Sequence, residues 1–147
     1  MFNTKLHDNG INLVGGNAVV AEEVGKGTFS LGLTDTDDIS DAQSNGGQLT
    51  MVFPDQGPQG DGTLALCTSV AMVKGTQHRE AAQKLIDFMV SRQVEQKLLD
   101  MKFARWSVRA GGCDSIKAMK VDYKAAAAVA RRAEREGLAL LEGRKPE

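Results

Sequence analysis

The segment LGLTDTDD, residues 31–38, places a cluster of carboxylates directly after a short apolar run. Clustered carboxylates can ligate a metal ion, carry out phosphoryl transfer or stabilise the start of a helix. An EF-hand calcium loop that began at Asp35 would need glycine at its sixth position and glutamate at its twelfth. Ser40 and Gly46 occupy those positions, so the sequence excludes this kind of calcium site.

The spacing of Asp35 and Asp37 resembles that of the two aspartates in phosphotransferases of the haloacid dehalogenase type. In that type one aspartate is the nucleophile, the other is a general acid, and magnesium bridges them to the phosphate. The resemblance ends at Ile39, where that type has threonine or valine, and the later strands supply no acidic pair. A magnesium-dependent phosphotransferase that uses Asp35 and Asp37 is therefore kept as an alternative function.

Helix capping is a further alternative, and it needs no ligand. Thr34 or Asp35 would cap a short helix, with Asp37 and Asp38 near the positive end of its dipole. On this interpretation the chain is an α/β module that binds no small molecule. Capping alone does not explain why polar residues follow an apolar strand, at the end where open α/β sheets bind their ligands.

A glycine turn, GGNAVV, is the second motif that could bind a ligand. Gly16 lets the backbone approach closely, and the amides of Asn17 and Ala18 would open a helix, whose N-terminus favours an anion. The motif is not a P-loop, because no Gly-Lys-Ser/Thr follows it. We find no nucleophile elbow either. The sequence therefore predicts no catalytic residue and no enzyme activity.

The order strand, glycine turn, helix, strand in residues 11–35 is a βαβ unit, which favours parallel pairing and an α/β fold. The patterns predict helices over 3–9, 17–25, 39–45, 79–100 and from 124, and strands over 11–16, 28–35, 48–54 and 63–75. The helix over 79–100 carries an apolar stripe, which we expect to lie in the core.

Composition and charge exclude several classes of protein. The 147-residue chain has a net charge of −1, so it lacks the basic surface that nucleic-acid binding needs. No apolar run is long enough to span a membrane, and the first residues lack the apolar core of a signal peptide. Cys67 and Cys113 show no CxxC pairing and are interpreted as two buried thiols, because a disulfide would need an oxidising compartment.

Several blocks of the sequence, spread over about residues 2–135, resemble the C-terminal half of bacterial extracellular solute-binding proteins of the iron(III), or family 1, type. These proteins are the receptors of ABC importers. The blocks are NGINLVGGNAVVAEEVGKGTFSLGLTDTDD, LTMVFPDQGPQGDGTL, SVAMVKGTQHREAAQKLIDFMVSRQVEQKLL and MKVDYKAAAA. The resemblance implies part of a type II periplasmic-binding-protein fold, with βαβ units, a mixed sheet and flanking helices, truncated at its N-terminus.

The same resemblance implies how the single segment 1–147 is organised. Residues 1–48 would form the βαβ part of the second lobe, and residues 49–105 the hinge strand and the return to the first lobe. Residues 106–147 would form the C-terminal helical part. Sheet edges left open by the absent first strands would favour a homodimer.

The resemblance also implies a ligand cleft lined by both motifs. Its ligand-binding residues would be Gly16, Asn17, Ala18, Thr34, Asp35, Thr36 and Asp37. Asp35 and Asp37 are the candidate metal ligands. Ferric-binding members have two adjacent tyrosines near these positions, whereas the one tyrosine of this chain is Tyr123. An acidic wall favours a cation and the helix-opening amides favour an anion, so a chelate or a zwitterion would suit both.

The implied partners and location follow from the receptor role. The ligand would be iron(III), another metal ion or its chelate, or another small polar solute, and no further cofactor is implied. The protein partner would be the membrane permease of an ABC importer, with no role for nucleic acid. The receptor would work in the periplasm or outside the cell, although no signal peptide is recognised in the sequence.

Overall fold

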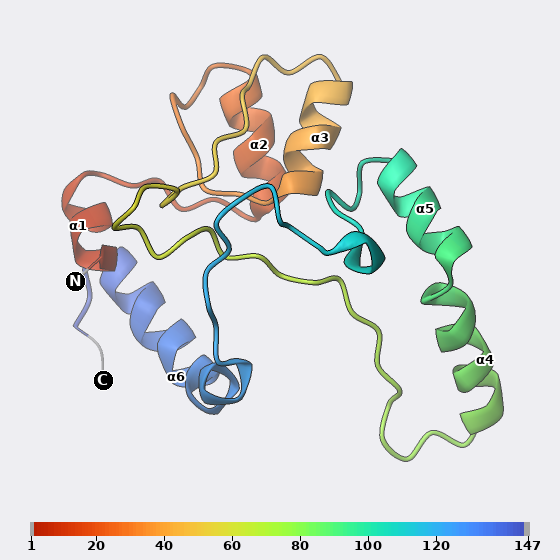
Figure 1. Ribbon diagram of the computed structural model, residues 1–147. Coiled ribbons are helices and arrows are strands. Elements are labelled where there is room, and N and C mark those ends of the chain that lie inside the picture. The colour runs from red at the N-terminus through yellow and green to blue at the C-terminus, as the bar shows by residue number, and fades with distance from the viewer. Residues whose placement is uncertain (1, 146–147) are drawn as a thin grey trace. The chain divides into compact units, whose positions relative to one another are not determined.

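The computed structural model describes residues 2–145. Its internal contacts divide the chain into two compact units. One unit combines Met1–Gly15 with Lys120–Glu147, and the other is Gly16–Met119. The helices are α1 (Phe2–Asp8), α2 (Asn17–Gly25), α3 (Thr36–Ser44), α4 (Arg79–Met89), α5 (Arg92–Asp100) and α6 (Tyr123–Leu141), with a 3-10 turn η1 (Val108–Ala110) (Figure 1).

Turn and cap residues set the ends of three helices where the sequence predicts them. α1 ends before Gly10, whose φ of 72° suits glycine at a helix C-terminus. α2 begins at Asn17, although its N-cap is Gly16 rather than the predicted Asn17. The Asp122 carboxylate accepts hydrogen bonds of 3.0 Å from the amides of Lys124 and Ala125, which starts α6.

Two other helices differ from the prediction. α3 begins at Thr36, earlier than the helix predicted over 39–45. Its N-cap is Asp35, with φ −109° and ψ 175°, and Asp37 and Asp38 lie in its first turn, as the capping alternative predicts, although the Asp35 side chain makes no capping hydrogen bond. The single helix predicted over 79–100 is two helices, α4 and α5. Ser91 separates them as the N-cap of α5, and its hydroxyl oxygen accepts a hydrogen bond of 3.4 Å from the amide of Val94.

The predicted strands are not present among the described residues, so the prediction of βαβ units and a mixed α/β sheet is not shown by this structure. One isolated parallel bridge joins Thr63 to Ala118. There the Thr63 amide donates to the Lys117 carbonyl, and the Met119 amide donates to the Thr63 carbonyl, both at 2.9 Å. A strand needs a neighbour at about 4.8 Å along its length, and the other extended segments find none.

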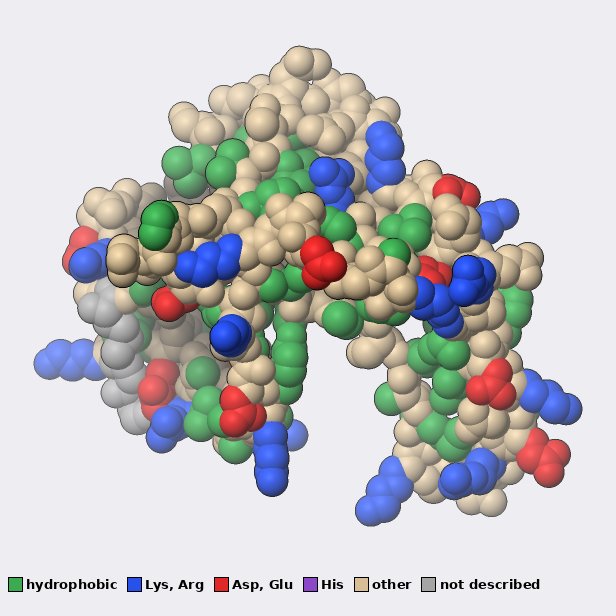
Figure 2. All heavy atoms as spheres, viewed as in Figure 1, with side chains coloured by type: hydrophobic (Ala, Val, Ile, Leu, Met, Phe, Trp, Pro, Cys, Tyr) green, Lys and Arg blue, Asp and Glu red, His purple; other side chains and the backbone are tan. Residues whose placement is uncertain are grey.

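Burial is sparse throughout the part of the chain that the structure describes. The buried hydrophobic residues there are Ala21 and Ala139, and Figure 2 shows hydrophobic side chains reaching the surface. The residues of the apolar stripe predicted to lie in the core of 79–100 are instead half-buried or exposed. Leu85 is 57% exposed, and neither α4 nor α5 has a buried residue. This prediction is wrong for the unit Gly16–Met119, because none of its other α-helices packs on α4 or α5.

In the unit formed by the two ends of the chain, α1 packs on α6. The Asn3 amide nitrogen donates to the Gly137 carbonyl at 3.4 Å, and His7 Nδ1 lies 3.1 Å from the Leu141 carbonyl oxygen. Polar contacts therefore connect both ends of α1 to the second half of α6.

Two further expectations concern the membrane and the cysteines. Among the described residues no helix combines the length and the apolar character needed to cross a bilayer. Cys67 and Cys113 are both free thiols. Cys67 is exposed and Cys113 is half-buried, so the prediction of two buried thiols is wrong for both residues.

Candidate functional site

The start of α2 is shaped by a glycine that no other residue replaces easily. Gly16, its N-cap, has φ 151° and ψ 172°, a backbone conformation that side-chain-bearing residues rarely adopt. No side chain caps this end of the helix. An added Cβ at Gly16 would meet nothing within 4 Å, so glycine is required here by the backbone and not by crowding.

The start of α3 lies against the start of α2, and two hydrogen bonds join them. The side-chain nitrogen Nδ2 of Asn17 donates to Asp35 Oδ2 at 2.7 Å, and the hydroxyl of Thr34 donates to the backbone carbonyl of Asn17 at 2.9 Å. α2 and α3 pack side by side, and both belong to the unit Gly16–Met119 (Figure 1). The two motifs singled out from the sequence therefore meet in space.

The adjoining starts of α2 and α3, residues 16–18 and 34–38, are called the corner below. Two carboxyl groups of the corner have pKa values shifted in opposite directions. Partial burial and a hydrogen bond to Asp35, together with the charges of Asp35, Asp37 and Asp41, raise the pKa of Asp38 to about 6. Burial would also raise the pKa of Asp35, but hydrogen bonds from Asp38 and Asn17 outweigh it and hold that pKa below its usual range. The Asp35–Asp38 pair thus shares one proton in mildly acidic solution.

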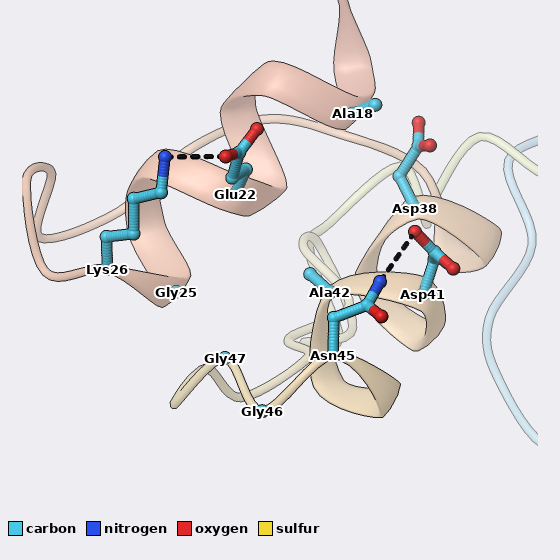
Figure 3. Close-up of a pocket in the computed structure, with 10 residues that line it drawn as sticks. All are labelled: Ala18, Glu22, Gly25, Lys26, Asp38, Asp41, Ala42, Asn45, Gly46 and Gly47. Atoms are coloured by element: carbon cyan, nitrogen blue, oxygen red, sulfur yellow. Dashed lines mark hydrogen bonds and ion pairs between the residues drawn. The ribbon is translucent and has the colours of Figure 1, made fainter.

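A groove of about 480 Å³ runs between α2 and α3 next to this corner. It is lined by Ala18, Glu22, Gly25 and Lys26 of α2 and by Asp38, Asp41, Ala42, Asn45, Gly46 and Gly47 at and after α3 (Figure 3). Its size lies within the usual range of small-molecule sites, roughly 300–1,000 Å³.

The polar groups of the groove are mostly acidic, and its one cation is paired. Lys26 Nζ lies 2.5 Å from Glu22 Oε1 and 3.1 Å from Glu23 Oε1. The Asn45 amide nitrogen donates to Asp41 Oδ2 at 3.2 Å (Figure 3). Because Lys26 is engaged by two glutamates, Asp38 and Asp41 give this wall an acidic character.

The seven predicted site residues all lie at the starts of α2 and α3. Asn17, Thr34 and Asp35 are brought together by hydrogen bonds, and Thr36 and Asp37 follow them in the first turn of α3. Ala18 is the one predicted residue that also lines the groove. The hydroxyl of Ser40 donates to the Thr36 carbonyl at 2.8 Å inside α3.

Other groove residues were missed by sequence reasoning. Glu22, Asp41 and Asn45 lie on the facing sides of α2 and α3. A signal was present, because Asp38, Asp41 and Asn45 recur at the spacing of one helix face. That face becomes meaningful only once α2 is known to lie beside it.

Asp35 and Asp37, the two predicted metal ligands, are not joined by a third metal-binding side chain among the described residues. Within residues 2–145 no group of three or more His, Cys, Asp or Glu side chains is arranged to hold a metal ion. A metal at Asp35 and Asp37 would therefore depend on donors that it brings with it.

Comparison with known proteins gives one match. The family model for the bacterial extracellular solute-binding proteins matches residues 2–130, which is most of the chain. No curated protein and no solved structure is a significant match.

Proposed function

Because the chain belongs to the bacterial extracellular solute-binding proteins, we propose that it binds a small, positively charged or zwitterionic solute where α2 and α3 begin. Membership of this family gives the coarse role: solute binding for an ABC transporter, with a permease as partner, in the periplasm or outside the cell. The family is generally not enzymatic. The solute and the residues that hold it are our proposal.

The observation that carries the proposal is the pair of hydrogen bonds between the two motifs. Asn17 bonds to Asp35, and Thr34 bonds to the carbonyl of Asn17. These bonds fix the first turns of α2 and α3 against each other. A recognition site gains from such preorganisation, since polar groups that are already oriented lose little entropy on binding.

The charge of the corner favours the solute class. Asp35, Asp37, Asp38 and Asp41 lie within two turns of chain, and the neighbouring Lys26 is occupied by Glu22 and Glu23. An amine or guanidinium group would find carboxylates here without a competing cation. The backbone amides at the start of α2, from Gly16 to Ala18, would donate hydrogen bonds to the carboxylate of a zwitterion.

A metal chelate is the second candidate solute. Asp35 and Asp37 would contribute two carboxylates, and the chelator would supply the remaining donors of the coordination shell. Iron(III) belongs to this class of solute, but the segment Thr34–Asp38 contains no tyrosine, and the one tyrosine of the sequence, Tyr123, begins α6. Nothing observed in the corner supports the magnesium-dependent phosphotransferase.

The finer organisation is also part of the proposal. Residues 1–48 would act as part of the second lobe of the receptor, residues 49–105 would include the hinge strand, and residues 106–147 the C-terminal helices. The chain would correspond to the C-terminal half of a receptor and would associate with a second copy.

Calorimetric titration with defined probes tests the ligand site. The probes are arginine, a linear diamine, ferric citrate and inorganic phosphate, each titrated into the purified chain. We expect saturable binding of arginine or the diamine, and a loss of at least about tenfold in affinity in Asp35→Asn, about 1.4 kcal/mol. Inorganic phosphate alone should not bind, because it would face the carboxylates.

The matched control is Asp61→Asn, which removes an exposed carboxylate far along the chain from both motifs. Its affinity should equal that of the parent protein. Circular dichroism confirms that both variants keep their helices. Equal affinities of Asp35→Asn and the parent for every bound probe would overturn the proposed site, and binding of ferric citrate alone would favour the chelate.

A further inference from the structure

The chain exposes far more surface than a folded protein of its mass. Its accessible surface is 11671 Å² for a mass of 15.7 kDa. A folded monomer of this mass exposes about 7,300 Å². This excess is larger than the area that each partner of an obligate interface buries, roughly 1,000–2,500 Å².

Two extended segments of the unit Gly16–Met119 account for a conspicuous part of the exposed apolar surface. In residues 49–53 and 63–66 the burial alternates from one residue to the next, as it does along a β-strand. Leu49, Met51 and Phe53 are half-buried, and the Phe53 ring lies 5.6 Å from the ring of Trp106. The opposite face is open, with Val52 79% exposed.

The second segment extends to Val73, but its burial alternates only at its two ends, because residues 66–69 are all exposed. Leu66 is 71% exposed and Val73 77% exposed, whereas Val70 and Met72 are half-buried. The apolar side chains on the open faces are Val52, Leu64, Leu66 and Val73. Such exposed apolar residues on extended chain are typical of a surface that a partner covers.

The backbone of residues 50–53 and 66–72 has unused hydrogen-bonding capacity, whereas the Leu49 carbonyl accepts a hydrogen bond of 2.9 Å from the Gln43 side chain. No hydrogen bond between backbone groups involves residues 49–53 or 66–72, all of which the structure describes. The region between them is nevertheless anchored. The Gln56 side chain bonds to both backbone groups of Lys117, at 2.7 and 3.0 Å, and Thr63 pairs with Ala118. The segments are thus held extended with open edges, the arrangement that accepts an added strand.

We propose that residues 49–53 and 66–72 form the interface with a second copy of this chain, by pairing as β-strands between the two copies. This inference concerns the assembly and does not rest on the identity of the solute. The strands that the sequence predicts over 48–54 and 63–75 would then form only when two copies associate.

Charge favours a second copy as the occupant. Residues 48–54 and 63–73 contain no charged residue, so a segment can lie beside its own copy across a two-fold axis without like-charge repulsion. The whole chain has a net charge of −1, which opposes self-association only weakly. Natural edge strands that must stay single carry Lys or Pro, and neither occurs within residues 49–53 or 66–72.

Sedimentation velocity from about 1 to about 100 µM measures the association. We expect a discrete dimer. Val52→Lys and Leu66→Lys should each raise its dissociation constant at least tenfold, because an ammonium group would be desolvated in the interface. The matched control is Met101→Lys, a side chain 70% exposed outside both segments, which should leave the dissociation constant unchanged.

Hydrogen exchange at the two ends of that concentration range tests whether strands form. Amides of residues 49–53 and 66–72 should become protected in the dimer and exchange freely in the monomer, whereas the amides inside α6 should not change. A monomer at about 100 µM, open-ended aggregates, or a dimer in which all three lysine variants behave alike would overturn the proposal. A persistent monomer would assign these edges to a different polypeptide.

Discussion

The α2–α3 corner and the α4–α5 pair are both made of two short helices, but different interactions hold them. In the corner, Asn17, Thr34 and Asp35 form hydrogen bonds across the two helix starts, and Ala21 and Ser40 are buried. In the other pair Ser91 ends one helix and starts the next, and no residue is buried. Hydrogen bonds within the chain organise the corner, whereas no other α-helix of the same unit packs on α4 or α5.

This difference teaches where function can be expected in the isolated chain. A site needs groups held within a fraction of an ångström, and the corner has cross-links that can do this. The open stripe and the extended segments instead have the properties of surfaces that acquire their final structure on contact with a partner. Substitutions should therefore have their largest effects in the corner.

The largest effect is expected for Gly32→Ala. A Cβ at Gly32 would lie 2.3 Å from Cγ1 of Val20 and 3.2 Å from Cγ2 of Val24, two side chains of α2. Because valine in a helix has essentially one rotamer, α2 would have to move. We expect a loss of about 1–3 kcal/mol in the free energy of unfolding, measured by urea denaturation. In Gly57→Ala the new methyl would meet nothing within 4 Å, and equal losses in the two variants would contradict this account.

A smaller loss is expected when the bond between the two helix starts is removed. Asn17→Ala should cost about 1 kcal/mol of stability, because the amide that donates to Asp35 is lost at a partly solvated site. A double-mutant cycle with Asp35→Ala isolates the interaction, and we expect a coupling energy of about 0.5–1.5 kcal/mol. Strictly additive losses would show that the two side chains do not stabilise each other.

A still smaller effect is expected in the α4–α5 pair. Leu85→Ala should change the free energy of unfolding by about 0.5 kcal/mol or less, because the side chain is 57% exposed in the single chain. A buried leucine would cost about 2–5 kcal/mol. The free energy of unfolding is measured at low micromolar protein concentration, so that association with a second copy does not contribute to it. A loss in the larger range would show that the helix pair already packs as a core.

Local signals in the sequence predict much of the helical structure. Gly10, Asp122 and the glycine turn before Asn17 fix helix ends through backbone conformation and capping, which depend on nearby residues. The break at Ser91 was missed because the apolar stripe continues across it. The serine cap outweighs that periodicity locally. The contact of Asn17 with Asp35 follows the prediction that their two motifs share one site.

The predicted strands fail for a different reason. Residues 48–54 have the composition and alternation of a strand, and their burial alternates accordingly, but a sheet is a property of two segments and not of one. The sequence contains no information on which partner is present. The groove residues Glu22 and Asp41 were missed for a similar reason, since their role depends on how α2 and α3 pack.

A pH dependence is also expected within the corner. The pKa of Asp38 is raised to about 6, so the folded state holds this proton more tightly than the unfolded chain does. Its contribution to stability is fully present below its ordinary pKa of 3.8 and is lost as the pH rises through about 6. The lowered pKa of Asp35 works in the opposite direction, since its contribution is lost as the pH falls. The two contributions therefore act in different pH ranges: that of Asp38 is lost between about pH 4 and pH 6, and that of Asp35 is lost below its ordinary pKa of 3.8.

Asp38→Asn separates these opposing contributions. The parent should lose part of its free energy of unfolding between about pH 4 and pH 6, because Asp38 ionises over this range. Asp38→Asn has no carboxyl to ionise there, so its free energy of unfolding should change less. Urea denaturation of both proteins at the two pH values measures the difference. Carbon-detected NMR titration gives a direct readout: one carboxyl should titrate near pH 6 in the parent, and Asp35→Asn should move that titration toward its ordinary value. If no carboxyl titrates above pH 5, then Asp35 and Asp38 do not share a proton, and the corner offers a ligand one more full negative charge than we infer.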